Sequence, residues 1–283
     1  MNFQLGCAIW AYKPWVGELY PAGSRATEFL SLYSQRFTTV EGNTTFYSTP
    51  DEATIARWVA ETPAGFEFCL KLPRSVTHQG ALTPMIPAAL HFLDHMSQLG
   101  DRLGVCFAQL PPSYSPRQFS DLTAFLQAWH YDKSRLALEV RHLDWFKQPH
   151  ASQLNELLQQ HGVGRVLLDT RPIYDCPDDP QLKSERKKPR LPLQKVMTAD
   201  FGLIRYISHP DRALNSRFLL EWVEQVAEWL QQGKQLYFFV HCPVEERSPA
   251  NARYVQQLLE QQGIPMATPV WEIDVAPTQL SLF

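Results

Sequence analysis

The sequence predicts an α/β protein whose single main domain is a closed (β/α)8 barrel of the TIM type. Eight short apolar or β-branched segments, typical of buried strands, recur along the 283 residues. Their starts advance by 29 to 37 residues, which is about the length of one strand–helix unit. An open doubly wound sheet is the rival fold, but no glycine-rich dinucleotide fingerprint follows the first segment. The regular spacing of the eight segments therefore favours the barrel.

The individual elements follow from local patterns. Strands are expected at residues 4–10, 37–43, 66–72, 103–110, 135–141, 164–170, 201–207 and 235–241. A capping box that starts at Thr49, with Pro50 at the first helical position, predicts the start of a helix. Apolar residues at helical spacing predict further helices, with stripes centred on Leu122, Leu158, Trp222 and Leu258.

The sixth strand–strand connection, residues 172–198, lacks the helical pattern of the other connections. It is rich in proline and has no apolar period, so a long loop is expected in place of helix six. The loop carries a run of basic residues from Lys183 to Lys195, which predicts a mobile segment that closes on a polyanion. The barrel is assigned to residues 1–264 and an extended C-terminal tail to 265–283.

Composition excludes several classes of protein. The formal charge is 26 − 29 = −3, and 45% of residues are apolar, which excludes a disordered chain or a uniformly basic nucleic-acid-coating protein. No signal peptide and no apolar run of the roughly 20 residues needed to span a membrane is found. The five cysteines form no CxxC pair, so free thiols in a reducing compartment are expected. A cytoplasmic protein without membrane contact is therefore predicted.

Charged and polar residues stand at the carboxyl ends of the predicted strands, where the active sites of barrels lie. A ligand site is expected there, and its strand-end members are Glu41, Asn43, Lys71, Gln109, Glu139, Arg141, Asp169, Arg171, Arg205 and His241. Arg74 and His78 follow Lys71 in the same loop. Three acids stand against four basic residues, so an anionic ligand is favoured over a cation. The alternative is a purely structural role, in which the charged residues only form ion pairs with one another, for example Glu139 with Arg141.

Beside anion binding, this set suits two chemical uses. Glu41, Glu139 or Lys71 are the candidate catalytic groups, since a carboxylate or a strand-end lysine can move a proton or form a Schiff base. A divalent metal held by Glu41, Glu139, Asp169 and His241 is the rival, but neighbouring basic side chains compete for the carboxylates. No metal or other cofactor is therefore expected. Aromatic residues on the rim, among them Trp10, Tyr12, Phe46 and Tyr47, are suited to stacking against bases or sugars.

Five stretches resemble the YecE-like family, a TIM-barrel domain of unknown function. They are GCAIWAYKPW, FTTVEGNTTFY, FEFCLKLPRSVTHQ, QLPPSYSP and LALEVRHLDWF. The resemblance implies the barrel fold and no established reaction. It also implies site roles for Trp10, Tyr12, Glu41, Asn43, Phe46, Tyr47, Lys71, His78, Gln109, Glu139, Arg141 and Asn251. The family often has Arg-x-His-Gly and Asn-Asn at the last two strands, where this chain has Arg205-Tyr206-Ile207-Ser208 and His241-Cys242.

Three functional hypotheses follow. The first is an enzyme that acts on a phosphate-bearing ligand such as a nucleic acid. The second is a non-catalytic accessory protein that binds nucleic acid and a partner, and the third is a sugar-phosphate isomerase or aldolase that uses Lys71. The tail adds a partner. Its last five residues, QLSLF, resemble the short motif by which bacterial proteins dock on the DNA polymerase sliding clamp. Gln279, Leu280, Leu282 and Phe283 are the predicted contacts, and a tail that packs back on the barrel is the alternative.

Overall fold

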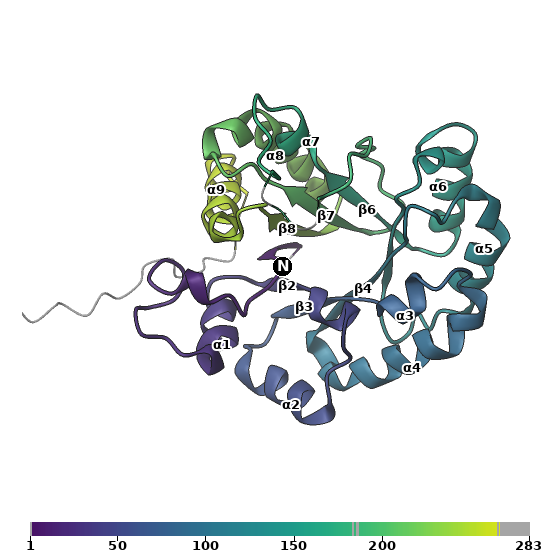
Figure 1. Ribbon diagram of the computed structural model, residues 1–283, viewed down its shortest axis with the longest axis horizontal. Coiled ribbons are helices and arrows are strands. Elements are labelled where there is room, and N and C mark those ends of the chain that lie inside the picture. The colour runs from purple at the N-terminus through teal and green to yellow at the C-terminus, as the bar shows by residue number, and fades with distance from the viewer. Residues whose placement is uncertain (1, 183, 185–186, 265, 267–283) are drawn as a thin grey trace, which may run out of the picture.

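The computed structural model describes residues 2–182, 184, 187–264 and 266. Eight parallel strands form one sheet that curls into a barrel, and helices surround it (Figure 1). The strands are β1 (Phe3–Cys7), β2 (Thr39–Gly42), β3 (Glu67–Lys71), β4 (Leu103–Gln109), β5 (Leu136–Glu139), β6 (Gly164–Asp169), β7 (Phe201–Ile207) and β8 (Gln235–His241). Each overlaps its predicted segment, so the predicted barrel is confirmed.

The helices lie on the outer face of the sheet, as their apolar stripes predict. In the described residues they are α1 (Phe29–Ser34), α2 (Glu52–Glu61), α3 (Arg74–Thr77), α4 (Ile86–Met96), α5 (Phe119–Ala128), α6 (His150–Gln160), α7 (Arg171–Tyr174), α8 (Ser216–Gln231) and α9 (Ser248–Gln261). Their buried stripes include Leu122, Leu158, Trp222 and Leu258. These side chains join one large apolar layer between the strands and the helices.

Helix α2 begins later than the sequence predicts. Asp51, and not Thr49, is the residue before its first turn, and its carboxylate accepts a hydrogen bond from the Thr54 backbone N–H at 2.8 Å. The predicted capping box at Thr49 is therefore wrong. Asp51 is itself a strong capping residue and directly precedes the first helical residue, so it is the N-cap of α2.

A long loop does replace a helix between β6 and β7, where only the single turn of α7 is present in the described residues. The loop has its own anchors. Gln181 is buried and its Oε1 accepts a hydrogen bond from the Lys188 backbone N–H at 2.6 Å, while the Tyr174 hydroxyl donates to the Lys188 carbonyl oxygen. These bonds fix the backbone at Lys188 and present its side chain to the carboxyl ends of the strands.

The barrel closes at a seam between β1 and β2 that rests on side chains as well as backbone. The Tyr33 hydroxyl accepts from the Cys7 N–H at 2.6 Å and donates to the Thr39 carbonyl oxygen at 3.1 Å. The Leu5 N–H donates to the Thr38 hydroxyl at 3.0 Å. The two strands approach so closely at Gly6 that a Cβ there would lie 2.1 Å from the Thr39 carbonyl oxygen. Only glycine fits at this position.

Two further expectations concern the whole chain. No helix in the part of the chain described above is long and apolar enough to cross a membrane. All five cysteines are free, and four of them are buried, with Cys176 partly exposed. The prediction of free thiols is confirmed.

Candidate functional site

Alternation along the strands decides which side chains enter the barrel. Apolar residues fill its interior, among them Cys69, Val105, Phe107, Ala137, Leu203 and Phe239. Residues two positions further along the same strands share that face. Lys71, Gln109, Glu139, Arg205 and His241 therefore point inward, above the apolar filling and at the carboxyl ends of the strands.

Arg205 forms the centre of this polar layer. Its Nε and Nη2 atoms donate to the two carboxylate oxygens of Glu41, each at 2.8 Å, and its Nη1 donates to Glu139. All three side chains are buried. Glu41 also accepts from Asn43 Nδ2 at 2.7 Å and contacts His241 Nε2 at 2.9 Å. The bidentate ion pair with Glu41 and the second ion pair with Glu139 fix the guanidinium group in one orientation.

The protonation states follow from these contacts. Burial raises the pKa of the Glu41 carboxyl, but Arg205 and His241 more than offset this and hold the pKa well below its ordinary value. For Glu139, burial is likewise outweighed by Arg205, Arg141 and Lys71, which lower its pKa to about 2. Burial lowers the pKa of His241 to about 4, against the opposing effect of Glu41. His241 is therefore neutral at pH 7 and donates its Nε2 proton to Glu41.

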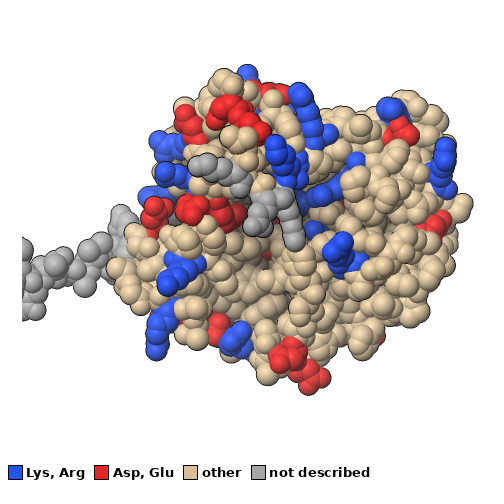
Figure 2. Space-filling view, viewed as in Figure 1, with Lys and Arg blue, Asp and Glu red and all other residues tan. Residues whose placement is uncertain are grey.

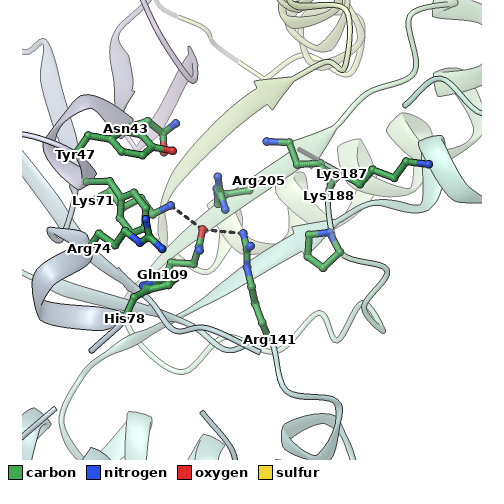
Figure 3. A pocket seen from close by; sticks show the side chains of 12 residues that line it. Asn43, Tyr47, Lys71, Arg74, His78, Gln109, Arg141, Lys187, Lys188 and Arg205 are labelled. Carbon is green, nitrogen blue, oxygen red and sulfur yellow. Dashed lines mark hydrogen bonds between the residues drawn. The ribbon is translucent and has the colours of Figure 1, made fainter. Parts of the chain in front are cut away.

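A cavity of about 470 Å³ lies above this layer. Six of its described lining residues are basic and none is acidic. The lining consists of Asn43, Phe46, Tyr47, Lys71, Arg74, His78, Gln109, Arg141, Lys187, Lys188, Pro189 and Arg205 (Figure 3). In the space-filling view, lysine and arginine side chains gather around the hollow near the centre of the face shown (Figure 2). Such a lining attracts anions.

Gln109 connects the two walls of the cavity. Its Oε1 accepts a hydrogen bond from Lys71 Nζ at 2.8 Å and another from Arg141 Nη2 at 2.7 Å (Figure 3). Arg141 also donates from Nε to Glu139 at 2.7 Å. Both cationic groups are thus held in place before any ligand arrives, which lowers the entropy that binding would cost.

Two lysines in the cavity have unusual titration behaviour. Lys71 is only 7% exposed, and its ammonium lies 3.9 Å from the centre of the Phe46 ring. Burial, followed by the charge of Arg205, lowers its pKa to about 7. Burial also lowers the pKa of Lys188 to about 8. The same cause lowers the pKa of His78 to about 4, so this imidazole is neutral at pH 7.

The structure brings together most, but not all, of the residues predicted from the sequence. The predicted residues that line the cavity are Asn43, Phe46, Tyr47, Lys71, His78, Gln109, Arg141 and Arg205. Glu41, Glu139 and His241 lie beneath it, in contact with Arg205 or with each other. Trp10, Tyr12, Asp169, Arg171 and Asn251 lie apart from it. Because the two candidate catalytic carboxylates are buried in ion pairs, they support the cavity and do not line it.

Asp169 and Arg171 face the outside of the barrel, which corrects their predicted place at the mouth. Val166 points into the interior, so alternation turns Asp169 toward α8. There Asp169 accepts from Trp222 Nε1 at 2.8 Å and pairs with Arg171, which also contacts Glu221 at 2.7 Å. The alternative of simple charge pairing holds for these residues.

The other displaced residues serve local packing. Trp10 meets Trp58 edge to face, with ring centres 5.2 Å apart. The Tyr12 hydroxyl donates to Glu246 at 2.7 Å. Asn251, on α9, donates to the Ser208 hydroxyl at 2.8 Å and to the His209 carbonyl oxygen at 3.1 Å.

Sequence reasoning missed three basic residues of the cavity as site residues, namely Arg74, Lys187 and Lys188. Arg74 was noted in the loop after Lys71 but was not singled out as a site residue. For Lys187 and Lys188 the signal was present in the basic run of the long loop, but the sequence did not indicate which members of that run reach the mouth. Lys187 pairs with Asp179 at 3.2 Å, whereas the backbone of Lys188 is held by Gln181.

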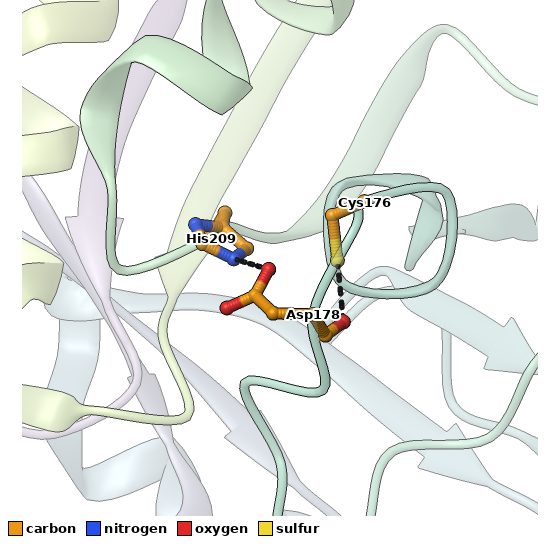
Figure 4. Close-up of side chains that lie close together, drawn as sticks. All are labelled: Cys176, Asp178 and His209. Carbon is orange, nitrogen blue, oxygen red and sulfur yellow. Dashed lines mark hydrogen bonds and ion pairs between the residues drawn. The ribbon is translucent and has the colours of Figure 1, made fainter.

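The four residues considered as metal ligands do not converge, because Asp169 faces α8 and Glu41 and Glu139 are both paired with Arg205. A different group, Cys176, Asp178 and His209, does lie together within the described residues (Figure 4). His209 Nδ1 accepts from the Asp211 N–H at 2.9 Å, so its proton is on Nε2 and is donated to Asp178 at 3.1 Å. A metal at Nε2 would need the opposite tautomer, so this group is better explained as a loop tether.

The fold and the site together define a (β/α)8-barrel protein with a preformed basic cavity at the carboxyl ends of its strands. The chain belongs to the DUF72 family, described as proteins of unknown function, whose model matches residues 4–272.

Its relatives include the UPF0759 protein YecE of Escherichia coli (strain K12), which is 34% identical over 248 residues, 87% of this chain and 88% of the relative. The UPF0759 protein YunF of Bacillus subtilis (strain 168) is 23% identical over 283 residues, 94% of this chain and 95% of the relative. A crystal structure of a DUF72 family protein from Thermotoga maritima MSB8 has the same fold, with a TM-score of 0.69 and 21% identity, over 92% of this chain and all of that one.

Proposed function

We propose that this protein is an enzyme whose basic cavity binds a small phosphate-bearing substrate. The observation that carries the proposal is the lining of the cavity, in which six basic side chains stand with no acidic partner among the described lining residues. A volume of about 470 Å³ suits a small molecule, or the end of a longer one. Guanidinium and ammonium groups supply the charged hydrogen bonds that phosphate oxygens accept.

The residues divide into two roles. Arg141 and Arg205 are fixed by Glu139 and Glu41, so they present donors to an anion without reorganising. Lys71 faces the same cavity and titrates near neutral pH, which suits the transfer of a proton to or from a bound substrate. The buried glutamates are poor bases, because their pKa values are lowered by the arginines.

The test is a titration with sulfate and inorganic phosphate, followed by a screen of phosphate-containing compounds for turnover. Arg141→Met should weaken anion binding about tenfold or more, because a charged hydrogen bond contributes roughly 1.5–3 kcal/mol. Arg57→Met, an exposed substitution on α2, is the matched control and should bind normally.

Turnover should require Lys71. A wild-type protein that binds neither anion, or binds a divalent cation in the cavity instead, would overturn the proposal.

We also propose, from the sequence alone, that the tail docks on the DNA polymerase sliding clamp and so brings the cavity to nucleic acid. Gln279, Leu280, Leu282 and Phe283 lie outside the described residues. Leu282 and Phe283 are two adjacent large apolar residues that fit an apolar pocket of a partner, and Gln279 adds directional hydrogen bonds. In this setting the phosphate would belong to a nucleic-acid end, and the protein could act there as an enzyme or as an accessory protein.

The clamp proposal is tested by measuring binding of the whole protein, and of a peptide of residues 275–283, to the clamp. Leu282→Ala combined with Phe283→Ala should abolish binding and leave the melting temperature unchanged. No affinity in the wild type, together with a large loss of thermal stability in the double variant, would show instead that the tail packs on the barrel.

A further inference from the structure

We propose that Lys71 condenses with the carbonyl group of a phosphorylated aldehyde or ketone and holds it as an imine. The inference deepens the proposed function and rests on it, because the basic cavity must first bind the phosphate. It names both a substrate class and a covalent role for one residue. The argument starts from the partners of the Lys71 amine.

The Lys71 amine lies in a cation-rich cavity and has no ion pair within the described chain. Its hydrogen-bond partner is the neutral amide oxygen of Gln109, at 2.8 Å, and its other close contact is the face of the Phe46 ring. The nearest acids are occupied, since Arg205 takes Glu41 and shares Glu139 with Arg141. The protein therefore supplies polar and aromatic contacts to this amine without supplying the carboxylate that would keep it protonated.

The charged and titratable groups that face Lys71 come from several elements. Arg205 on β7 and Arg141 after β5 oppose its protonation, whereas Glu139 on β5 and Glu41 on β2 favour it. His78, which follows α3, is neutral. With burial included, the pKa is about 7, so roughly half of the amine is neutral at pH 7, against about one in 3,000 for a lysine at 10.5. The neutral amine is the nucleophilic form.

The covalent step balances with one proton taken from the solvent and one water released. The Nζ lone pair attacks the carbonyl carbon, and the C=O π pair moves to the oxygen. A proton passes from nitrogen to that oxygen through water and gives a carbinolamine. A second proton, taken up from the solvent, lets the hydroxyl leave as H₂O, while the nitrogen lone pair forms the C=N bond of a protonated imine. One proton is therefore taken up for each protonated imine formed from the neutral amine. The basic groups across the cavity, among them Arg141 and Lys188, would hold the phosphate.

The experiment treats the whole protein with glyceraldehyde 3-phosphate or dihydroxyacetone phosphate and then with borohydride, which reduces an imine to a stable secondary amine. Peptide mapping of the wild type should place the adduct on Lys71, and sulfate should suppress it. Unphosphorylated glyceraldehyde should give at least tenfold less adduct at the same concentration. The rate of trapping should rise with pH through a midpoint near 7.

Lys71→Arg and Lys71→Met should both lose the adduct, and Lys147→Arg, at an exposed lysine outside the cavity, should retain it. Mapping in the wild type does not depend on the folding of any variant. An adduct spread over surface lysines, in a protein that still binds these compounds competitively with sulfate, would overturn the imine and leave the proposed function standing. Failure to bind both sulfate and the sugar phosphates would overturn the proposed function itself.

Discussion

The carboxylate of Glu139 is stable as a buried anion because Arg205 and Arg141 both donate to it. Its pKa is lowered to about 2, so its interactions stabilise the fold above its ordinary pKa near 4.5 and are lost as the pH falls toward 2. Glu139→Gln should lower the free energy of unfolding at pH 7 by about 3 kcal/mol, because it leaves buried positive charge unpaired. Urea unfolding of both proteins should show this gap shrinking between pH 5 and pH 2. A gap that stays constant across this range would contradict the assignment.

If the cavity binds anions as proposed, Lys71 and Lys188 should make the affinity depend on pH. Their pKa values are lowered to about 7 and about 8, so both are charged at pH 6 and both are largely neutral at pH 9. Sulfate keeps its charge over this range, and its affinity should fall about tenfold or more as two charged contacts are lost. Calorimetry at pH 6, 7.5 and 9 measures this. Lys71→Met should bind sulfate more weakly at pH 6 and vary less with pH, whereas a wild-type affinity independent of pH would exclude the shifted lysines as ligands.

At the scale of elements, the loop after β6 connects two strands as a helix does in the other strand–helix units. The loop also places Lys187 and Lys188 in the lining of the cavity. Its described residues are held by a few specific bonds, of which the buried Gln181 supplies the one to the Lys188 N–H. Gln181→Leu removes that acceptor and should weaken sulfate binding several-fold, at a cost in stability of about 1 kcal/mol. Leu182→Ala, at a neighbouring side chain that is 76% exposed, should change neither quantity. Equal effects of the two substitutions on sulfate affinity would show that Gln181 does not position Lys188.

The barrel as a whole depends on the seam between β1 and β2. Tyr33→Phe leaves the Cys7 N–H and the Thr39 carbonyl oxygen without their shared partner, which should lower the free energy of unfolding by roughly 1–3 kcal/mol. Hydrogen exchange should show β1 and β2 losing protection before β6 and β7. Tyr131→Phe, which removes one hydrogen bond to the end of α5, should cost less and leave the seam protected. Uniform loss of protection in Tyr33→Phe would mean that the seam is no weaker than the rest of the sheet.

The sequence was sufficient for the fold because each unit carries its own local signal. A buried parallel strand is a short apolar run, and an outer helix has a stripe at a period of 3.6 residues. Local signals also have limits, as α2 shows. Thr49 and Asp51 are both capping residues, and the sequence pattern preferred the first although the chain uses the second.

The sequence by itself determined the eight strands, the loop in place of a helix, and the concentration of basic residues at the strand ends. Only the tertiary structure decided which of those residues share a cavity. Strand β6 has apolar residues on both faces, so its pattern does not reveal that Asp169 points outward to Trp222. The arrival of Lys188 at the mouth, and the low pKa of Lys71, depend on Gln181, Gln109 and Arg205, which are distant in sequence. Charge and burial act through space, and the chain alone does not state the distances over which they act.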